Sequence, residues 1–248
     1  MKSHRQIHQQ GTAKASRKRK LFPETIHNPL PKATGWLIFN QIVLIFAIGC
    51  IFGTYYEEII TLWKNFLNTG TIEWFSRRGL VYGPFSPVYG MGAVGIYLLF
   101  YRTRASWQRC FVGGALLGGI FEYVLSLMQE WIFNTRSRDY SDRFLDIGGR
   151  TTIPYMLFWG LLVVVAAHWL FPMLERAYQR LEGRGMNIFC GFLAAFLVFD
   201  IAMSFAATLR QAERREGDAA DTKIELFLDR HFPDERLKQI YDNAKPVE

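Results

Sequence analysis

The stretch GLVYGPFSPVYGMGAVGIYLLFY, residues 79–101, has no charged side chain and is long enough to cross a bilayer. It also contains Pro84 and Pro87 together with four helix-weakening glycines: Gly83, Gly90, Gly92 and Gly95. In hydrocarbon, irregular backbone survives only where protein buries it or where it lines a cavity. The pattern therefore predicts a broken or re-entrant segment over residues 80–87 that leads into a helix over residues 88–101. A surface loop followed by a short helix is the alternative.

Other mostly apolar stretches of roughly twenty residues, the length that a helix needs to cross a bilayer, lie on both sides of this one. Their approximate bounds are Trp36–Tyr56, Cys110–Phe133, Thr151–Leu174 and Met186–Leu209. The sequence therefore predicts an all-α fold, namely a polytopic helical membrane protein with about five membrane segments. The second of these segments is the broken or re-entrant one.

The polar ends of the chain set the expected domain boundaries. Residues 1–34 are basic and contain three prolines, which predicts a disordered N-terminal tail. Residues 35–210 form the expected helical membrane domain. Residues 211–248 are rich in charge and predict a C-terminal tail with short amphipathic helices, the first ended by Pro233 and the second capped by Asp234.

Basic residues are concentrated in the ends and loops, and the densest cluster is Arg17-Lys18-Arg19-Lys20. On a chain anchored in a bilayer, such a cluster predicts contact with anionic lipid on the cytoplasmic side rather than binding of nucleic acid. With five segments and the N-terminus inside, the short regions on the inner side hold 14 lysines and arginines, against 10 in the outer loops and the first residues of the C-terminal tail up to Arg215, which favours a cytoplasmic N-terminus. The basic start of the C-terminal tail favours the opposite orientation. We expect a multi-pass protein of the cell membrane.

Glu122 is the most informative charged residue, because a carboxylate inside an apolar helix costs at least about 2.5–3.5 kcal/mol. It shares one helix face with Ser126 and Glu130, which follow at intervals of four. Glu122 should therefore face the bundle and find a partner, either Arg78, Arg150 or a proton of its own. Two interpretations stay open, a substrate or proton site and a structural ion pair. Asp200, with Ser204 one turn later, raises the same question.

The loop between residues 134 and 150 contains Asp139, Asp142 and Asp146, which could gather a metal ion or act as acid and base. Several arginines in the same loop neutralise these carboxylates, so an ion-paired loop is the favoured interpretation. The chain has no G-x-x-x-x-G-K-[ST] phosphate-binding motif, no H-E-x-x-H motif and no G-x-S-x-G motif. We therefore predict no catalytic residue, no metal site and no cofactor.

A series of unusual motifs extends along the membrane region. They are Tyr56-Glu57, the run RGLVYGPFSPVYGMG over residues 78–92, Phe121-Glu122-Tyr123, Glu130 followed by Trp131-Ile132-Phe133, Asp139-Tyr140-Ser141-Asp142, Ile147-Gly148-Gly149-Arg150 and Phe158-Trp159-Gly160. In this order they resemble a bacterial membrane-protein family, ABC-transporter type IV (CmpB-like), over roughly residues 36–209. The family pattern usually has Asn before the Gly-Arg pair. Gly148 stands there in this chain, which leaves Asp146 as the polar residue to take that role.

The resemblance implies a permease or transport component of a membrane and, by analogy, a separate nucleotide-binding subunit. We expect the helix that begins at Val88 to point its positive N-terminus at an anionic group. The expected substrate-binding residues are Glu57, Arg78, Tyr82, Pro84, Pro87, Tyr89, Glu122, Glu130, Asp139, Asp142 and Arg150. Two alternatives remain: an intramembrane enzyme that acts on a lipid-like substrate through Glu122 or Asp142, and a structural or regulatory membrane protein.

Overall fold

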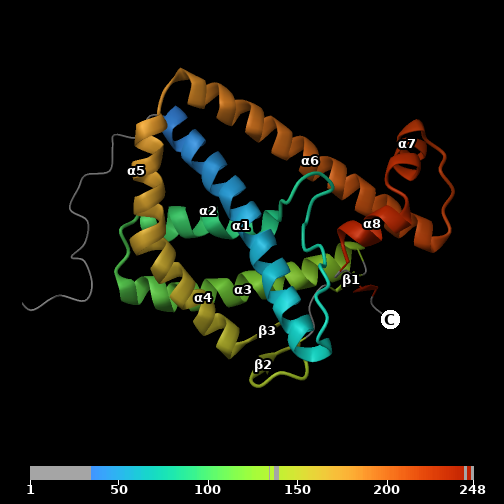
Figure 1. Cartoon of the computed structure of the whole chain (residues 1–248), viewed down its shortest axis with the longest axis horizontal. Coiled ribbons are helices and arrows are strands. Elements are labelled where there is room, and N and C mark those ends of the chain that lie inside the picture. Colours follow the sequence, from blue (N-terminus) through green and yellow to red (C-terminus); the bar gives the residue numbers. More distant parts are fainter. Residues whose placement is uncertain (1–34, 134, 137–139, 243–244, 247–248) are drawn as a thin grey trace, which may run out of the picture. The chain divides into compact units, whose positions relative to one another are not determined.

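A computed structural model describes residues 35–133, 135–136, 140–242 and 245–246. Most of this part is helical (Figure 1). The long elements are α1 (Gly35–Thr69), α2 (Pro87–Ile96) with a π-helical turn η1 (Tyr97–Tyr101), α3 (Trp107–Phe133), α4 (Ile153–Val165) with a second π-helical turn η2 (Ala166–Leu170) and α5 (Phe171–Leu181), and α6 (Arg184–Glu216). Two short helices follow, α7 (Lys223–His231) and α8 (Asp234–Ile240).

Sheet structure is confined to two pairs of two-residue strands. β1 (Thr135–Arg136) pairs with β4 (Lys245–Pro246), and β2 (Asp146–Ile147) pairs with β3 (Thr151–Thr152), both antiparallel. The second pair brings the start of α4 back to the loop that carries Arg150. It thereby fixes the position of this arginine relative to α3 and α4.

Four of the described helical stretches are long and apolar enough to cross a membrane: Leu37–Thr69, Trp107–Ile132, Ile153–Leu181 and Arg184–Glu216. A shorter apolar helix, Pro87–Tyr101, completes the set. The predicted all-α membrane fold is confirmed, and the short helix corresponds to the broken second segment. Helix α1 continues to Thr69 instead of ending near Tyr56, because residues 57–69 contain neither proline nor glycine to stop it.

The break before α2 is an irregular segment that protein buries. Leu80 and Val81 are only 2% and 3% exposed, as expected for irregular backbone that protein buries. The backbone N–H of Val81 donates to Ser204 Oγ at 2.9 Å, and that of Tyr82 donates to Asp200 Oδ1 at 3.1 Å. Side chains of α6 thus satisfy buried donors that a helix would have satisfied internally.

Close contacts between helices depend on glycines. A Cβ atom at Gly90 of α2 would lie 2.5 Å from the Cys50 sulfur of α1, and one at Gly118 of α3 would lie 2.5 Å from Trp159 of α4. Such distances are too short for any side chain, so these glycines allow the helices to approach. The Gly114-x-x-x-Gly118 pattern therefore marks the face of α3 that packs on α4.

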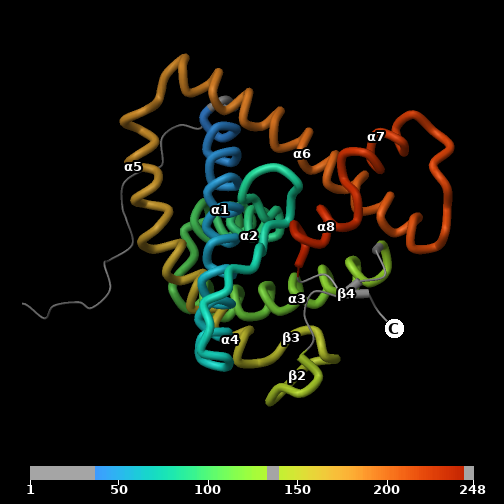
Figure 2. Tube along the Cα trace, turned by 45° about the vertical axis from the view of Figure 1, so that its right-hand side comes forward, coloured from blue at the N-terminus to red at the C-terminus, as the bar shows by residue number. Residues whose placement is uncertain are grey.

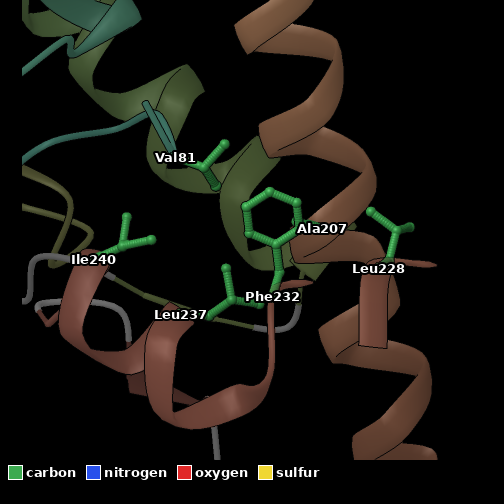
Figure 3. Packing of buried hydrophobic residues seen from close by; sticks show 6 residues of the cluster. All are labelled: Val81, Ala207, Leu228, Phe232, Leu237 and Ile240. Carbon is green, nitrogen blue, oxygen red and sulfur yellow. The ribbon is translucent and has the colours of Figure 1, made fainter. Parts of the chain in front are cut away.

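Helices α7 and α8, which we call the C-terminal cap, pack against the second half of α6 (Figure 2). Figure 3 shows the apolar cluster that joins the cap to α6 and to the segment before α2: Val81, Ala207, Leu228, Phe232, Leu237 and Ile240. Ion pairs add to it, since Asp229 lies 3.0 Å from Arg210 and 2.5 Å from Arg214. These two arginines hold the pKa of Asp229 below its ordinary value.

Candidate functional site

A cavity of about 430 Å³ lies where the segment before α2 meets α1, α3, α6 and the end of the C-terminal cap. Its charged lining residues are Glu57, Arg77, Arg78, Glu122, Arg150 and Arg215. Apolar side chains line most of the remaining wall, among them Leu80, Phe121 and Phe205. The four arginines outnumber the two glutamates, so the lining carries an excess of positive charge. We call this space the central cavity.

Hydroxyl groups hold both of the carboxylates that line the central cavity. Tyr89 donates its hydroxyl hydrogen bond to Glu57. Glu122 accepts hydrogen bonds from Tyr140 at 3.0 Å and from Thr151 at 2.9 Å, and it is only 9% exposed. Because their charge is stabilised by fixed donors, these carboxylates form a satisfied part of the wall.

Arg150 is held by α3. Its Nη2 lies 2.8 Å from Glu130 Oε2, and its Nη1 donates to Ser126 Oγ at 3.1 Å. The loop that presents Arg150 turns through Gly148 and Gly149, whose φ angles of +60° and +67° favour glycine. Asp146 Oδ2 accepts the backbone N–H of Gly149 at 2.9 Å and stabilises this turn. Arg150 is thus a positively charged wall residue with its partners in place.

Arg78 differs from Arg150. In the part of the chain that the structure describes it forms no hydrogen bond and no ion pair, and its Nε is buried without a partner. Asp200, which is fully buried, lies within electrostatic reach, but its Oδ1 already accepts the N–H of Tyr82. Arg78 therefore offers an unused guanidinium group to the central cavity.

Other unsatisfied polar atoms accompany Arg78. Asp200 Oδ2 is buried and has no hydrogen-bond partner among the described residues. The buried hydroxyl of Tyr241 forms no hydrogen bond of good geometry among the described residues, although it lies close enough to Ser204 and Thr208 in the cavity wall to interact with both. Buried polar groups without partners are costly and uncommon. These atoms and Arg78 together form a polar end of the central cavity.

The structure brings most of the predicted site residues together. Those that line the central cavity are Glu57, Arg78, Pro87, Tyr89, Glu122 and Arg150. Glu130 is one step removed and holds Arg150. Tyr82 and Pro84 lie on the segment before α2, where Tyr82 stacks on Phe199 and meets the edge of Phe232.

Two predicted residues do not join the group. Asp142 is exposed on its loop and is not part of the cavity wall, and Asp139 lies outside the described residues. Over the described residues, no group of three or more His, Cys, Asp or Glu side chains could hold a metal ion.

Several wall residues were not among the predicted ones. Ser204 stood out in the sequence only as a companion of Asp200, and Ser126 only by its helical spacing from Glu122. Gln211, Arg215 and Tyr241 carried no sequence signal, because they belong to the region expected to be a separate tail. The sequence likewise gives no signal for hydroxyl partners such as Thr151, since serine and threonine are common at helix starts.

The sequence pattern of the family described as "Putative ABC-transporter type IV" matches residues 44–205. This chain belongs to that family. The matched region includes the segment before α2, Glu122 and Arg150, and it ends within α6 before the C-terminal cap. No curated protein and no solved structure matches the chain. Its family and its four described helices of membrane-spanning length and polarity indicate a membrane protein, in a family whose description names an ABC-transporter type.

Proposed function

We propose that this protein is a permease-like transport component that binds a small organic anion in the central cavity. The observation that carries the proposal is the unpaired guanidinium of Arg78 in a cavity where the carboxylates already have donors. Arg78 is half-buried and its Nε is buried without a hydrogen-bond partner, and a ligand carboxylate, sulfonate or phosphate would supply two parallel hydrogen bonds.

The start of α2 supports an anionic ligand. Pro87 and Val88 of its first turn line the central cavity, so the positive end of the helix dipole faces this space. Arg77 and Arg215 add positive charge from the sides. In this proposal Arg78 is the main anion contact, while Glu57, Glu122, Glu130 and Arg150 form the polar wall that positions it.

The size and lining of the cavity favour an anion with an apolar body. Its volume of about 430 Å³ lies within the range of small-molecule sites, roughly 300–1,000 Å³. Side chains such as Leu80 and Phe205 would contact the apolar part of the ligand while Arg78 binds the charge. A bare inorganic anion would leave this apolar surface uncovered.

The wider setting also belongs to the proposal. We place the protein in a bacterial cell membrane as a multi-pass component with a cytoplasmic N-terminus, whose basic residues 14–20 lie against anionic lipid. Because the chain has no phosphate-binding loop of its own, energy from ATP would come from a separate nucleotide-binding subunit. Crosslinking in cells followed by purification in mild detergent tests this partnership, and recovery of the chain without any such subunit would contradict it.

Binding of matched probes tests the anion site. The full chain in lipid nanodiscs is titrated by calorimetry with 1-adamantanecarboxylate, 1-adamantanol, acetate and phosphate. We expect the adamantane carboxylate to bind best, and Arg78→Gln to weaken it at least about tenfold, since hydrogen bonds to charged groups contribute about 1.5–3 kcal/mol.

The matched control is Arg143→Gln, which removes the same charge from an exposed loop position outside the cavity wall. This variant should bind the carboxylate like the unmodified protein. Absence of binding by every anion, or equal binding by Arg78→Gln, would overturn the proposal.

A further inference from the structure

We propose a second ligand site, for a compact apolar molecule that carries a primary ammonium group. It lies in a cavity of about 290 Å³ between α1, η1, α5 and the start of α6. The exposed wall of this cavity is almost wholly apolar, with side chains such as Leu44, Ile48, Phe171, Leu174 and Phe189. We call it the α5 pocket.

One carboxylate gives the α5 pocket its chemistry. Glu175 lines the pocket and is 9% exposed. Its Oε2 accepts the hydroxyl of Tyr101, whereas its Oε1 is buried and has no hydrogen-bond partner among the described residues. A buried carboxylate oxygen without a donor is costly, and a ligand ammonium would supply both the hydrogen bond and the opposite charge.

The other polar side chains nearby either have partners or lie outside the pocket wall, as does Asn40, whose Nδ2 donates to Tyr178 while its buried Oδ1 has no partner among the described residues. Gln41 accepts the hydroxyl of Tyr97 at 2.7 Å. Of the nearby cations, Arg102 lies beside that same hydroxyl and Arg176 is exposed, and neither forms an ion pair with Glu175 in the described part of the chain. The unsatisfied acceptor in the pocket is therefore Glu175.

The surroundings of Glu175 select among ligand classes. An anion would meet the carboxylate at close range in apolar surroundings, where repulsion is strongly unfavourable. A purely apolar ligand would fill the pocket but leave Oε1 without a donor. In a ligand with an ammonium on a compact hydrocarbon body, the ammonium would pair with the carboxylate. The hydrocarbon would pack against the apolar wall, which includes Leu174 and Phe189.

The α5 pocket is separate from the central cavity. On α1, Gln41 lines the pocket and Glu57 lines the cavity. These residues are sixteen positions apart, about 24 Å at the rise of an α-helix. The inference therefore stands or falls independently of the proposed anion site, and a ligand bound here need not be the transported solute.

Three probes with one hydrocarbon body test the inference: 1-aminoadamantane, 1-adamantanol and 1-adamantanecarboxylate. Calorimetric titration of the full chain in nanodiscs, corrected with empty nanodiscs, should show the amine binding at least about tenfold more tightly than the alcohol. Glu175→Gln should reduce this preference to less than about threefold. Glu182→Gln removes the same charge from an exposed position just beyond α5, outside the pocket wall, and should keep the preference.

A second variant locates the site without altering charge. Leu174→Trp should fill the pocket and abolish tight binding of the amine, while Arg78→Gln should leave amine binding unchanged. An amine that binds no more tightly than the alcohol to the unmodified protein would overturn the inference. So would a preference for the amine that survives either Glu175→Gln or Leu174→Trp.

Discussion

The central cavity and the α5 pocket leave groups of opposite charge without a hydrogen-bond partner. In each site a glutamate accepts a hydrogen bond from a tyrosine hydroxyl: Tyr89 donates to Glu57 in the cavity, and Tyr101 donates to Glu175 in the pocket. In the cavity, further donors and an excess of arginine leave a guanidinium, that of Arg78, without a partner. In the pocket, the oxygen of Glu175 remains unsatisfied.

If both proposals hold, the net charge of a cavity lining does not by itself predict what the site binds. In the two proposed sites the sign of the ligand follows from the group that the protein leaves without a partner. Arg150 and Arg78 both line the central cavity, yet Glu130 and Ser126 hold only the first of them. The comparison therefore separates wall residues that already have partners from the residues that we propose as ligand contacts.

The largest expected loss of stability comes from replacing Arg150, the arginine that is paired with Glu130. Arg150 has an 11% exposed side chain and an ion pair with Glu130, so Arg150→Gln should destabilise the protein by about 3 kcal/mol through the carboxylate left without its partner. Arg78→Gln should cost less stability than Arg150→Gln, because it breaks no hydrogen bond or ion pair among the described residues and removes only the longer-range attraction to Asp200. Thermal melting of both variants in the same detergent measures the difference.

The double variant Arg150→Gln with Glu130→Gln is the control for that prediction. It should recover much of the stability lost in Arg150→Gln, since neither charge is then left alone. Equal losses in Arg78→Gln and Arg150→Gln would remove the distinction between wall and ligand contact.

A smaller loss of stability is expected at the contact between α1 and α2. Gly90 of α2 packs on Cys50 of α1; α1 lines both the cavity and the pocket, α2 lines the cavity, and η1, which continues α2, lines the pocket. Gly90→Ala should cost about 1–3 kcal/mol by overpacking and should weaken both amine and carboxylate binding. Calorimetry and thermal melting check the two parts of the prediction.

Gly92→Ala is the matched control on the same helix, because nothing lies within 4 Å of the Cβ atom it would add. It should be neutral or slightly stabilising, since alanine favours helix more than glycine does. If Gly90→Ala weakened only one kind of ligand, the two sites would not share the α1–α2 contact in the way inferred here.

The smallest effect concerns the C-terminal cap, which contributes Tyr241 to the central cavity but nothing to the α5 pocket. Arg210 and Arg214 lower the pKa of Asp229 in the folded protein. Its ion pairs therefore stabilise the cap above the unfolded pKa of about 4, and this stability is lost as the pH falls through the lower folded pKa. Asp229→Asn should lower stability by about 1 kcal/mol at pH 7, and this loss should shrink as the pH falls below about 4.

Melting curves at both pH values test this, with Asp242→Asn, an exposed position at the end of the cap, as the control. At pH 7 the Asp229→Asn change should also weaken carboxylate binding slightly and leave amine binding intact. A loss of stability that is equal at pH 3 and pH 7 would contradict the role given to the ionised Asp229.

The sequence predicted the membrane fold because length and polarity are local properties. Runs of about twenty apolar residues must be helical in a bilayer, and prolines with glycines must break one of them. It also predicted Glu57, Arg78, Glu122 and Arg150 as members of one site, since isolated charges near apolar helices need burial and partners. It did not predict the continuation of α1 to Thr69, because a polar helix and a polar loop look alike there.

The amino-acid sequence by itself thus determined the helices, the break before α2 and the charged residues that gather in the protein interior. Only the tertiary structure decided which of those charges are paired. Helical spacing placed Ser126 and Glu130 on the face of Glu122, but the fold set Arg150 against Glu130 and left Arg78 and Glu175 each with an unused hydrogen-bonding group. Pairing depends on segments far apart in the chain, and free energies of a few kcal/mol per buried charge make that choice decisive.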